Sequence, residues 1–222
     1  MKKNYTHISF VLDRSGSMAS TMDDTIGGFN KFLEDQQKEK GTCTLSMMQF
    51  DTEFESLYTF KKIKEVPKLN EETFKPRGMT ALLDAIGKTI VETEEEIKRL
   101  DKKNQPEKVL FVILTDGQEN SSKEYKKIRI NEMIKDYGKK NKWQFIFLGA
   151  NQNAIHEAGG LGIKMGNAMN FVQDTNGIKA SYNSLSRSIS NYRDENVDAD
   201  MMSDMEAFSE EDREEQNKAW NK

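Results

Sequence analysis

The residues best suited to chemistry lie in the run VLDRSGSM, residues 11–18. An apolar, strand-like segment ends at Asp13, and Ser15 and Ser17 follow at alternate positions around Gly16. One carboxylate and two hydroxyls on a tight turn make a cluster of oxygen ligands. Hard divalent cations prefer such ligands, and Mg²⁺ takes a few protein oxygens and completes its octahedron with water. This run therefore predicts a site for a hard divalent cation.

Two later segments offer further oxygens. Residues 77–80 form a glycine turn that places the Thr80 hydroxyl immediately before a predicted helix. Residues 114–117, Leu-Thr-Asp-Gly, end an apolar run with Asp116. In open α/β sheets, ligands bind outside the carboxyl ends of the strands. We therefore expect the three segments to meet at one edge of a sheet.

The elements that would position these segments alternate between strands and helices. Apolar alternation and length predict strands over 7–12, 43–50, 54–60, 109–114, 144–148 and 168–171. Helical spacing predicts helices over 22–40, 81–103, 124–140, 153–160 and 177–192. This order predicts an α/β fold with a doubly wound, mostly parallel central sheet and helices on both faces. The hairpin 43–60 adds one antiparallel edge strand.

Taken together, the three segments resemble the metal-ion-dependent adhesion site (MIDAS) of von Willebrand factor type A (VWA) domains. The DxSxS loop matches Asp13, Ser15 and Ser17, the threonine loop matches Thr80, and the TDG loop matches Asp116. The resemblance implies that the hydroxyls ligate a cation, with the two carboxylates in direct or water-mediated contact. It also implies an open coordination position that accepts an Asp or Glu side chain of a partner protein.

The resemblance covers residues 5–150, and through Tyr192 the chain resembles small stand-alone bacterial and bacteriophage members of the family. It implies a Rossmann-like fold and a non-enzymatic protein-binding module. Mg²⁺ is the expected ion, and Mn²⁺ and Ca²⁺ are alternatives. For single members of the set a simpler interpretation stays open: Ser17 and Thr80 as helix caps, and Asp116 as a plain turn residue.

Residues beside the ligand set are candidates for a partner-binding rim. They are Arg14, Gly78, Met79, Glu119 and Asn120. Arg14 projects from the predicted metal loop and is suited to contact an acidic ligand, or is simply solvated. Glu119 and Asn120 line the rim or cap the following helix.

The charge distribution suggests two parts, a domain over 1–193 and an acidic tail over 194–222. The formal net charge is −4, which argues against a general nucleic-acid-binding surface. Residues 194–215 include eleven acidic residues and one basic residue, Arg213. We expect this tail to be mobile or loosely docked.

A cytoplasmic protein is the expectation from cysteine usage and hydropathy. Cys43 is the single cysteine, so an intrachain disulfide is impossible and a reducing compartment fits. The N-terminus lacks the apolar core of a signal peptide. The run Val109–Leu114 is far shorter than the roughly 20 residues of a membrane span.

Two other functions compete with the binding module. An aspartate after the first strand of a doubly wound sheet also suits a Mg²⁺-dependent hydrolase or phosphotransferase. The position of the second acid in aspartyl-phosphate enzymes is here Ser15, and no Walker-A loop is present. The two histidines, His7 and His156, are far apart in the sequence, which gives little material for a zinc site or a Ser-His-Asp triad. The third possibility is self-association, in which the acidic tail supplies the carboxylate.

Overall fold

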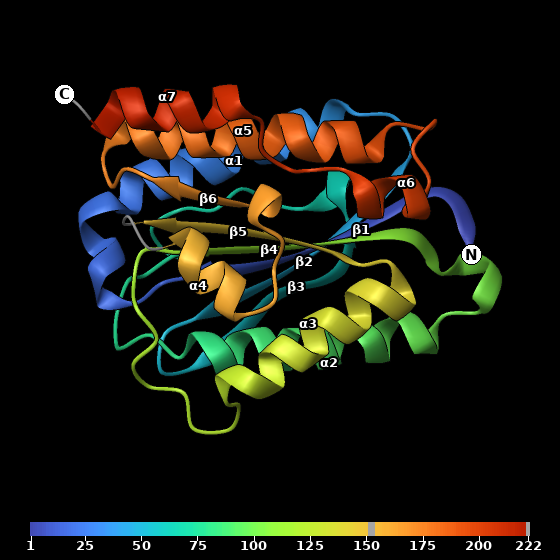
Figure 1. Cartoon of the computed structure of the whole chain (residues 1–222), viewed down its shortest axis with the longest axis horizontal. Coiled ribbons are helices and arrows are strands. Elements are labelled where there is room, and N and C mark those ends of the chain that lie inside the picture. The colour runs from blue at the N-terminus through green and yellow to red at the C-terminus, as the bar shows by residue number, and fades with distance from the viewer. Residues whose placement is uncertain (151–153, 221–222) are drawn as a thin grey trace.

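The computed structural model describes residues 1–150 and 154–220. Its core is a six-stranded sheet in the order β3-β2-β1-β4-β5-β6 (Figure 1). Neighbouring strands run parallel except β3, which pairs antiparallel with β2 at one edge. The predicted doubly wound α/β fold with one antiparallel edge strand is confirmed. The strands are β1 (Lys2–Asp13), β2 (Thr42–Phe50), β3 (Phe54–Lys62), β4 (Pro106–Thr115), β5 (Gln144–Ala150) and β6 (Ala168–Phe171).

Helices cover both faces of the sheet (Figure 1). α1 and α5 pack together on one face, and α7 lies against α5. α2, α3 and α4 cover the other face. The helices are α1 (Met22–Lys38), α2 (Leu82–Arg99), α3 (Lys127–Asn141), α4 (Ala154–Gly160), α5 (Thr175–Arg193), α6 (Ala199–Asp204) and α7 (Glu210–Trp220).

The central strand β4 shows why helices must cover both faces of the sheet. Leu110, Val112 and Leu114 belong to the apolar core beneath α1 and α5. Phe111 and Ile113 belong to the core beneath α2 and α3. Because successive side chains of a strand point to opposite faces, an unbroken apolar run is stable only between two layers of helices.

Several predicted helix boundaries shift where side chains capture backbone groups. The helix predicted over 124–140 begins at Lys127, because three backbone N–H groups ahead of it bond to the buried carboxylate of Asp84 instead. The donors are Lys123, Glu124 and Tyr125, at 2.8, 3.0 and 2.7 Å. The helix predicted over 81–103 ends at Arg99, since Leu100 is extended. Asn153, predicted to begin the short helix α4, lies outside the described residues.

The acidic segment after Arg193 differs from the expected mobile or loosely docked tail. Within residues 194–220 it forms α6 and α7, and Met202, Ala207 and Phe208 are buried in the same core as α1 and α5. The ammonium group of buried Lys108 donates to the carbonyl oxygens of Asp194 and Val197, at 2.9 and 2.6 Å. Composition gave no sign of these contacts, because only a few apolar residues among many acids anchor the segment.

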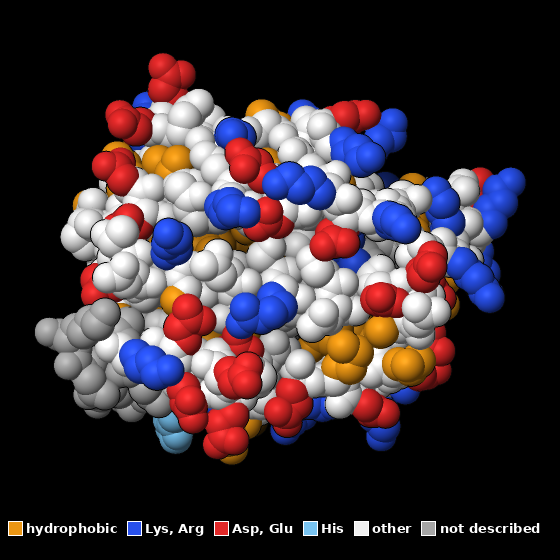
Figure 2. Space-filling model, turned by 90° about the horizontal axis from the view of Figure 1, so that it is seen from above, with side chains coloured by type: hydrophobic (Ala, Val, Ile, Leu, Met, Phe, Trp, Pro, Cys, Tyr) orange, Lys and Arg blue, Asp and Glu red, His pale blue; other side chains and the backbone are white. Residues whose placement is uncertain are grey.

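The surface above these helices carries charges of both signs. Figure 2 shows acidic and basic side chains interspersed over this face rather than one negative surface. Arg187 of α5, for example, is paired with Asp212 of α7. Within the described part of the chain, no helix combines the length and the apolar character needed to cross a membrane.

Candidate metal centre

The three predicted loops meet at the carboxyl ends of β1 and β4. These strands are neighbours, with Leu12 opposite Leu114, so Asp13 and Asp116 emerge side by side from the sheet edge. The loop carrying Thr80 is tied to the first loop by backbone hydrogen bonds. The N–H of Arg77 donates to the carbonyl of Arg14 at 2.8 Å. A second such bond joins Gly16 to Gly78 at 3.2 Å. Main-chain pairing therefore brings the three segments together.

Side-chain contacts link the DxSxS loop to the TDG loop. The hydroxyl oxygens of Ser15 and Ser17 lie 3.1 Å apart, and the Ser17 hydroxyl donates to Asp116 Oδ1 at 2.6 Å. Asp13 accepts the Ser15 backbone N–H on Oδ1 at 2.7 Å and the Thr115 hydroxyl on Oδ2 at 2.5 Å. These contacts join Asp13, Ser15, Ser17, Thr115 and Asp116 into one cluster, in which the backbone N–H of Ser15 connects the two serines to Asp13.

Thr80 reaches the same cluster beside Gly117. A Cβ atom added at Gly117 would lie 2.7 Å from Thr80 Oγ1 and 3.6 Å from Asp13 Oδ2. Glycine thus lets the TDG loop approach the Thr80 hydroxyl, whereas the distance to Asp13 would be an ordinary van der Waals contact. The side chain of Thr80 caps no helix, since α2 has Ala81 at its N-cap and no side-chain cap bond. The N-cap position of α1 is likewise Thr21 rather than Ser17. The interpretation of Thr80 and Ser17 as caps is therefore wrong.

Burial sets the electrostatics of the cluster. Asp13, Ser15, Thr80 and Asp116 are buried, whereas Ser17 is exposed and leaves one side of the cluster open to solvent. Burial raises the pKa of Asp13 to about 6, against the lowering effect of its bonds from Thr115 and Ser15. Burial also raises the pKa of Asp116. Ser15 and Thr115 donate to Asp13, and Ser17 and Gln173 donate to Asp116. These donors are neutral, so a cation would offset the cost of ionising the two carboxylates.

Comparison with known proteins assigns this architecture. The von Willebrand factor type A domain matches residues 7–184. The chain belongs to this family. Comparison with curated protein sequences gave no match. The cluster of Asp13, Ser15, Ser17, Thr80 and Asp116 thus occupies the carboxyl edge of a VWA domain.

Solved structures share the VWA fold at low identity. The manganese-loaded TRAP protein of Plasmodium vivax has a TM-score of 0.56 and 16% identity, covering 78% of this chain and 70% of that one. Proximal thread matrix protein 1 of the mussel byssus, with a zinc-occupied MIDAS motif, has a TM-score of 0.58 and 13% identity, with 86% and 47% covered. The pilus adhesin SpaC of Lactobacillus rhamnosus GG has a TM-score of 0.62 and 12% identity, with 90% and 31% covered. This VWA chain thus spans about half of the mussel protein.

The donor set of this VWA domain fits a hard cation. Three hydroxyls and two carboxylates supply only oxygen, the ligand type of Mg²⁺, Mn²⁺ and Ca²⁺. Across residues 1–150 and 154–220, no group of three or more His, Cys, Asp or Glu side chains is arranged to hold a metal ion. Hydroxyl ligands are therefore essential to any site at this edge.

The predicted rim residues Met79 and Asn120 are both exposed, but they differ in their contacts. Met79 is 52% exposed beside Thr80. Asn120 instead accepts the backbone N–H of Thr80 on Oδ1 at 2.9 Å, and Glu119 accepts that of Leu83 on Oε2 at 2.9 Å. Glu119 and Asn120 thus fix the backbone of the threonine loop, a role that sequence reasoning had not assigned to them.

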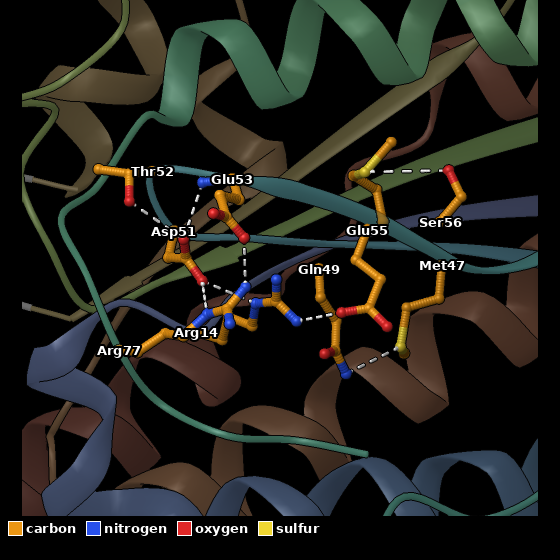
Figure 3. Close-up of polar contacts among 10 residues, drawn as sticks. Arg14, Met47, Gln49, Asp51, Thr52, Glu53, Glu55, Ser56 and Arg77 are labelled. Atoms are coloured by element: carbon orange, nitrogen blue, oxygen red, sulfur yellow. Dashed lines mark hydrogen bonds and ion pairs between the residues drawn. The ribbon is translucent and has the colours of Figure 1, made fainter.

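Arg14 corrects the rim prediction. Its side chain is buried, because Nε donates to Asp51 Oδ2 at 2.9 Å and Nη1 to Glu55 Oε2 at 2.5 Å (Figure 3). Arg77 approaches the same carboxylate from the other side, with Nε 2.9 Å from Asp51 Oδ2. We call Arg14, Asp51, Glu53, Glu55 and Arg77 the Asp51 ion cluster.

The Asp51 ion cluster supports two of the three metal loops. Arg14 lies within the DxSxS loop and Arg77 precedes the threonine loop, so one buried carboxylate holds both. The Asp51 carbonyl also accepts the N–H of Ala81 at 3.0 Å. Gly78 has a φ of +66°, and a Cβ there would lie 3.3 Å from Asp51 Cβ, so this turn favours glycine.

Two further contacts of the centre were missed from sequence. Thr115 bonds Asp13, as described above. Gln173, just after β6, donates from Nε2 to Asp116 Oδ2 at 2.5 Å. Thr115 precedes Asp116 in the TDG loop, which was a usable signal. Gln173 lies 57 residues from Asp116, in a polar loop without a motif.

Proposed function

We propose that this VWA domain is a non-enzymatic, metal-dependent protein-binding module that captures an acidic side chain of a partner. Asp13, Ser15, Ser17, Thr80 and Asp116 would hold the divalent cation. When bound, such a cation offers positive charge to a partner carboxylate. The observation that carries the proposal is the connected oxygen cluster, buried on one side and open to solvent at Ser17.

Mg²⁺ is the proposed ion. Small hydroxyl ligands and few charges suit a cation that keeps part of its water shell, whereas Ca²⁺ takes more ligands, often bidentate carboxylates. Mn²⁺ shares the preference for oxygen. Calorimetric titration of the protein with each of the three ions ranks them, and the proposal expects a saturable Mg²⁺ isotherm that Asp13→Ala abolishes.

The alternative of a Mg²⁺-dependent hydrolase or phosphotransferase gains little support from the contacts. The hydroxyl of Ser15, two residues after Asp13, is hydrogen-bonded to that of Ser17 at 3.1 Å. No residue that could act as a general base follows Ser15 within the loop. Self-association through the acidic segment gains little either, since α6 and α7 pack on their own domain. A screen with phosphomonoesters and nucleotides tests the first alternative, and sedimentation with and without Mg²⁺ tests the second.

The proposed setting is cytoplasmic, with neither nucleic acid nor membrane as a partner. The single cysteine, Cys43, is buried, and burial raises the pKa of its thiol to about 11, so it is a poor nucleophile. The negative net charge does not favour nucleic acid. Fractionation of cells that produce a tagged protein tests the setting.

A pull-down tests the main proposal directly. Wild-type protein, Asp116→Ala and the control Asp35→Ala are immobilised in Mg²⁺, and captured proteins are compared with those held in EDTA. Asp35 is a matched acid because it lies on the surface of α1, paired with Lys31. We expect partners that are lost with EDTA and with Asp116→Ala, and kept with Asp35→Ala. Capture that is unchanged in EDTA and in Asp116→Ala contradicts the proposal.

A further inference from the structure

A cavity of about 330 Å³ lies next to the metal centre, between the TDG loop, the start of α2, β5 and α4. This volume is within the range of about 300–1,000 Å³ typical of ligand sites. The apolar side chains that line it are Leu82, Leu83, Phe147, Ala150, Ala154 and Leu161. The cavity lies at the carboxyl edge of the sheet, as the metal centre does.

The cavity and the metal centre share a wall. Thr115 lines the cavity, and its hydroxyl bonds Asp13. Gly117 also lines the cavity, and it lies against the hydroxyl of Thr80. A ligand carboxylate at the centre therefore places the neighbouring part of the same ligand within reach of the cavity.

The charged side chains of the cavity wall already have partners within the protein, and Gln118 is an exposed polar residue of the same wall. The Glu119 carboxylate accepts backbone N–H groups of Leu83, Ser121 and Ser122. Lys127 and Glu157 pair with each other at 2.7 Å. Because these groups are satisfied by the protein itself, the cavity offers mainly apolar surface to an occupant.

We propose that this cavity receives an aliphatic or aromatic side chain from the same protein segment whose acidic residue binds at the metal centre. This inference rests on the proposed function and adds specificity to it. The cation accepts almost any carboxylate. The cavity restricts the choice to partner segments in which an apolar side chain lies a few positions from the acidic residue. Full burial of such a side chain tightens binding by about 10- to 100-fold.

A peptide array tests the inference. Each peptide carries one fixed Glu, flanked by positions that are varied singly over all amino acids in a Gly/Ser background, and binding is read in Mg²⁺ and in EDTA. We expect Mg²⁺-dependent binding with a preference for Leu, Ile, Met or Phe at one position. Leu83→Trp, which fills the cavity, is expected to remove this preference, and Leu83→Ala to shift it toward larger side chains. Ile128→Trp is the control, since Ile128 is exposed on α3 outside the cavity.

Two measurements keep the test decisive. Thermal melts and Mg²⁺ calorimetry are run on each variant, and unchanged Mg²⁺ affinity is expected for all three. Methyl NMR of the wild-type protein with the tightest peptide is expected to shift the signals of Leu82, Leu83 and Leu161. This readout does not depend on whether any Leu83 variant folds.

The outcomes separate the two proposals. Glu- and Mg²⁺-dependent binding without an apolar preference, or with one that survives Leu83→Trp, overturns the cavity inference and leaves the proposed function intact. Absent shifts at the three leucines also overturn the inference. Binding that needs neither Glu nor Mg²⁺ overturns the proposed function, and with it the inference.

Discussion

Two groups of acids lie side by side at the carboxyl edge of the sheet, and the protein treats them in opposite ways. Asp51, at the end of β2, is 1% exposed and lies against two guanidinium groups. Asp13, at the end of the neighbouring β1, is also buried, but its donors are a hydroxyl and a backbone N–H. Both side chains are shielded from solvent, but Asp13 is enclosed more deeply by protein than Asp51, and the partners of the two carboxylates differ.

This difference appears in the pKa values. Burial disfavours the charged form of Asp51, yet its hydrogen bonds and ion pairs with Arg77 and Arg14 lower its pKa below the ordinary value. Burial raises the pKa of Asp13 to about 6. The Asp51 ion cluster thus contains its own positive charges, whereas burial makes the charge of the carboxylates at the candidate metal centre costly, a cost that the proposed cation would lower.

The largest expected effect comes from breaking the completed cluster. Asp51→Asn removes the charge that faces the buried guanidinium of Arg14, and loss of one partner from a buried pair costs about 3–5 kcal/mol. We expect the free energy of unfolding to fall by this amount in metal-free protein. Urea denaturation in EDTA measures it. Glu53→Gln is the control, because Glu53 is exposed and bonds only the outer side of Arg77. An Asp51→Asn protein as stable as wild type would show that the ion pairs of Asp51 contribute little to stability.

Mg²⁺ is expected to stabilise the wild-type domain by about 2.7 kcal/mol at a concentration 100 times its Kd. Asp116→Asn, which weakens the oxygen cluster directly, is expected to lose this gain. Asp51→Asn is expected to weaken Mg²⁺ binding by about 10- to 100-fold, since Arg14 and Arg77 then position their loops less well. Thermal melts over a Mg²⁺ series give all three values. Equal Mg²⁺ stabilisation in wild type and Asp116→Asn would place the ion elsewhere.

Asp13→Asn is expected to stabilise the metal-free domain, opposite in sign to Asp51→Asn. Because the pKa of Asp13 is higher in the folded state, its contribution to stability is present at low pH and is lost as pH rises through about 6. Asp13→Asn removes the cost of ionising a buried carboxyl, but Asn keeps only one acceptor oxygen for two donors. The net gain in the free energy of unfolding at pH 7 is therefore expected to be about 1–2 kcal/mol.

The pH dependence provides the check on this prediction. The stability difference between Asp13→Asn and wild type in EDTA is expected to shrink as pH falls from about 6 toward 4. Taking the difference removes the opposite contribution of buried His7, whose pKa burial lowers to about 3. A variant less stable than wild type at neutral pH without metal would refute the prediction.

The sequence predicted the sheet and the meeting of the three loops because both follow from local patterns. The unbroken apolar run in β4 required helices on both faces, and strand ends on neighbouring strands required Asp13 and Asp116 to meet. The burial of Arg14 depends on the β2–β3 hairpin, which brings Asp51 and Glu55 to it from about forty residues away. Such contacts have no signature in the spacing of residues.

The packing of the acidic segment also depends on contacts that residue spacing and composition do not reveal. Its composition predicted a mobile or loosely docked tail, whereas contacts of particular residues hold it on the domain. Phe208 is buried in the core, Lys108 binds the turn that follows α5, and Gln216 of α7 bonds Val172 and Gly177. Average charge describes the solvent side of a helix, whereas a few buried residues decide whether the helix docks.

The smallest expected effect separates the inner from the outer half of the Asp51 ion cluster. Arg77 is 53% exposed, so solvent and salt screen its pair with Asp51, whereas Arg14 remains beside the carboxylate at 5% side-chain exposure. Arg77→Gln is therefore expected to shift the melting temperature by about a quarter or less of the Asp51→Asn shift. Arg14→Gln is expected to approach the full shift, since it leaves the buried Asp51 with only its solvent-side partner. Differential scanning calorimetry at low and high salt compares the variants. Equal shifts for Arg77→Gln and Arg14→Gln would mean that the exposed guanidinium contributes as much as the buried one, and the contrast between the two acids would then not depend on burial of the pair.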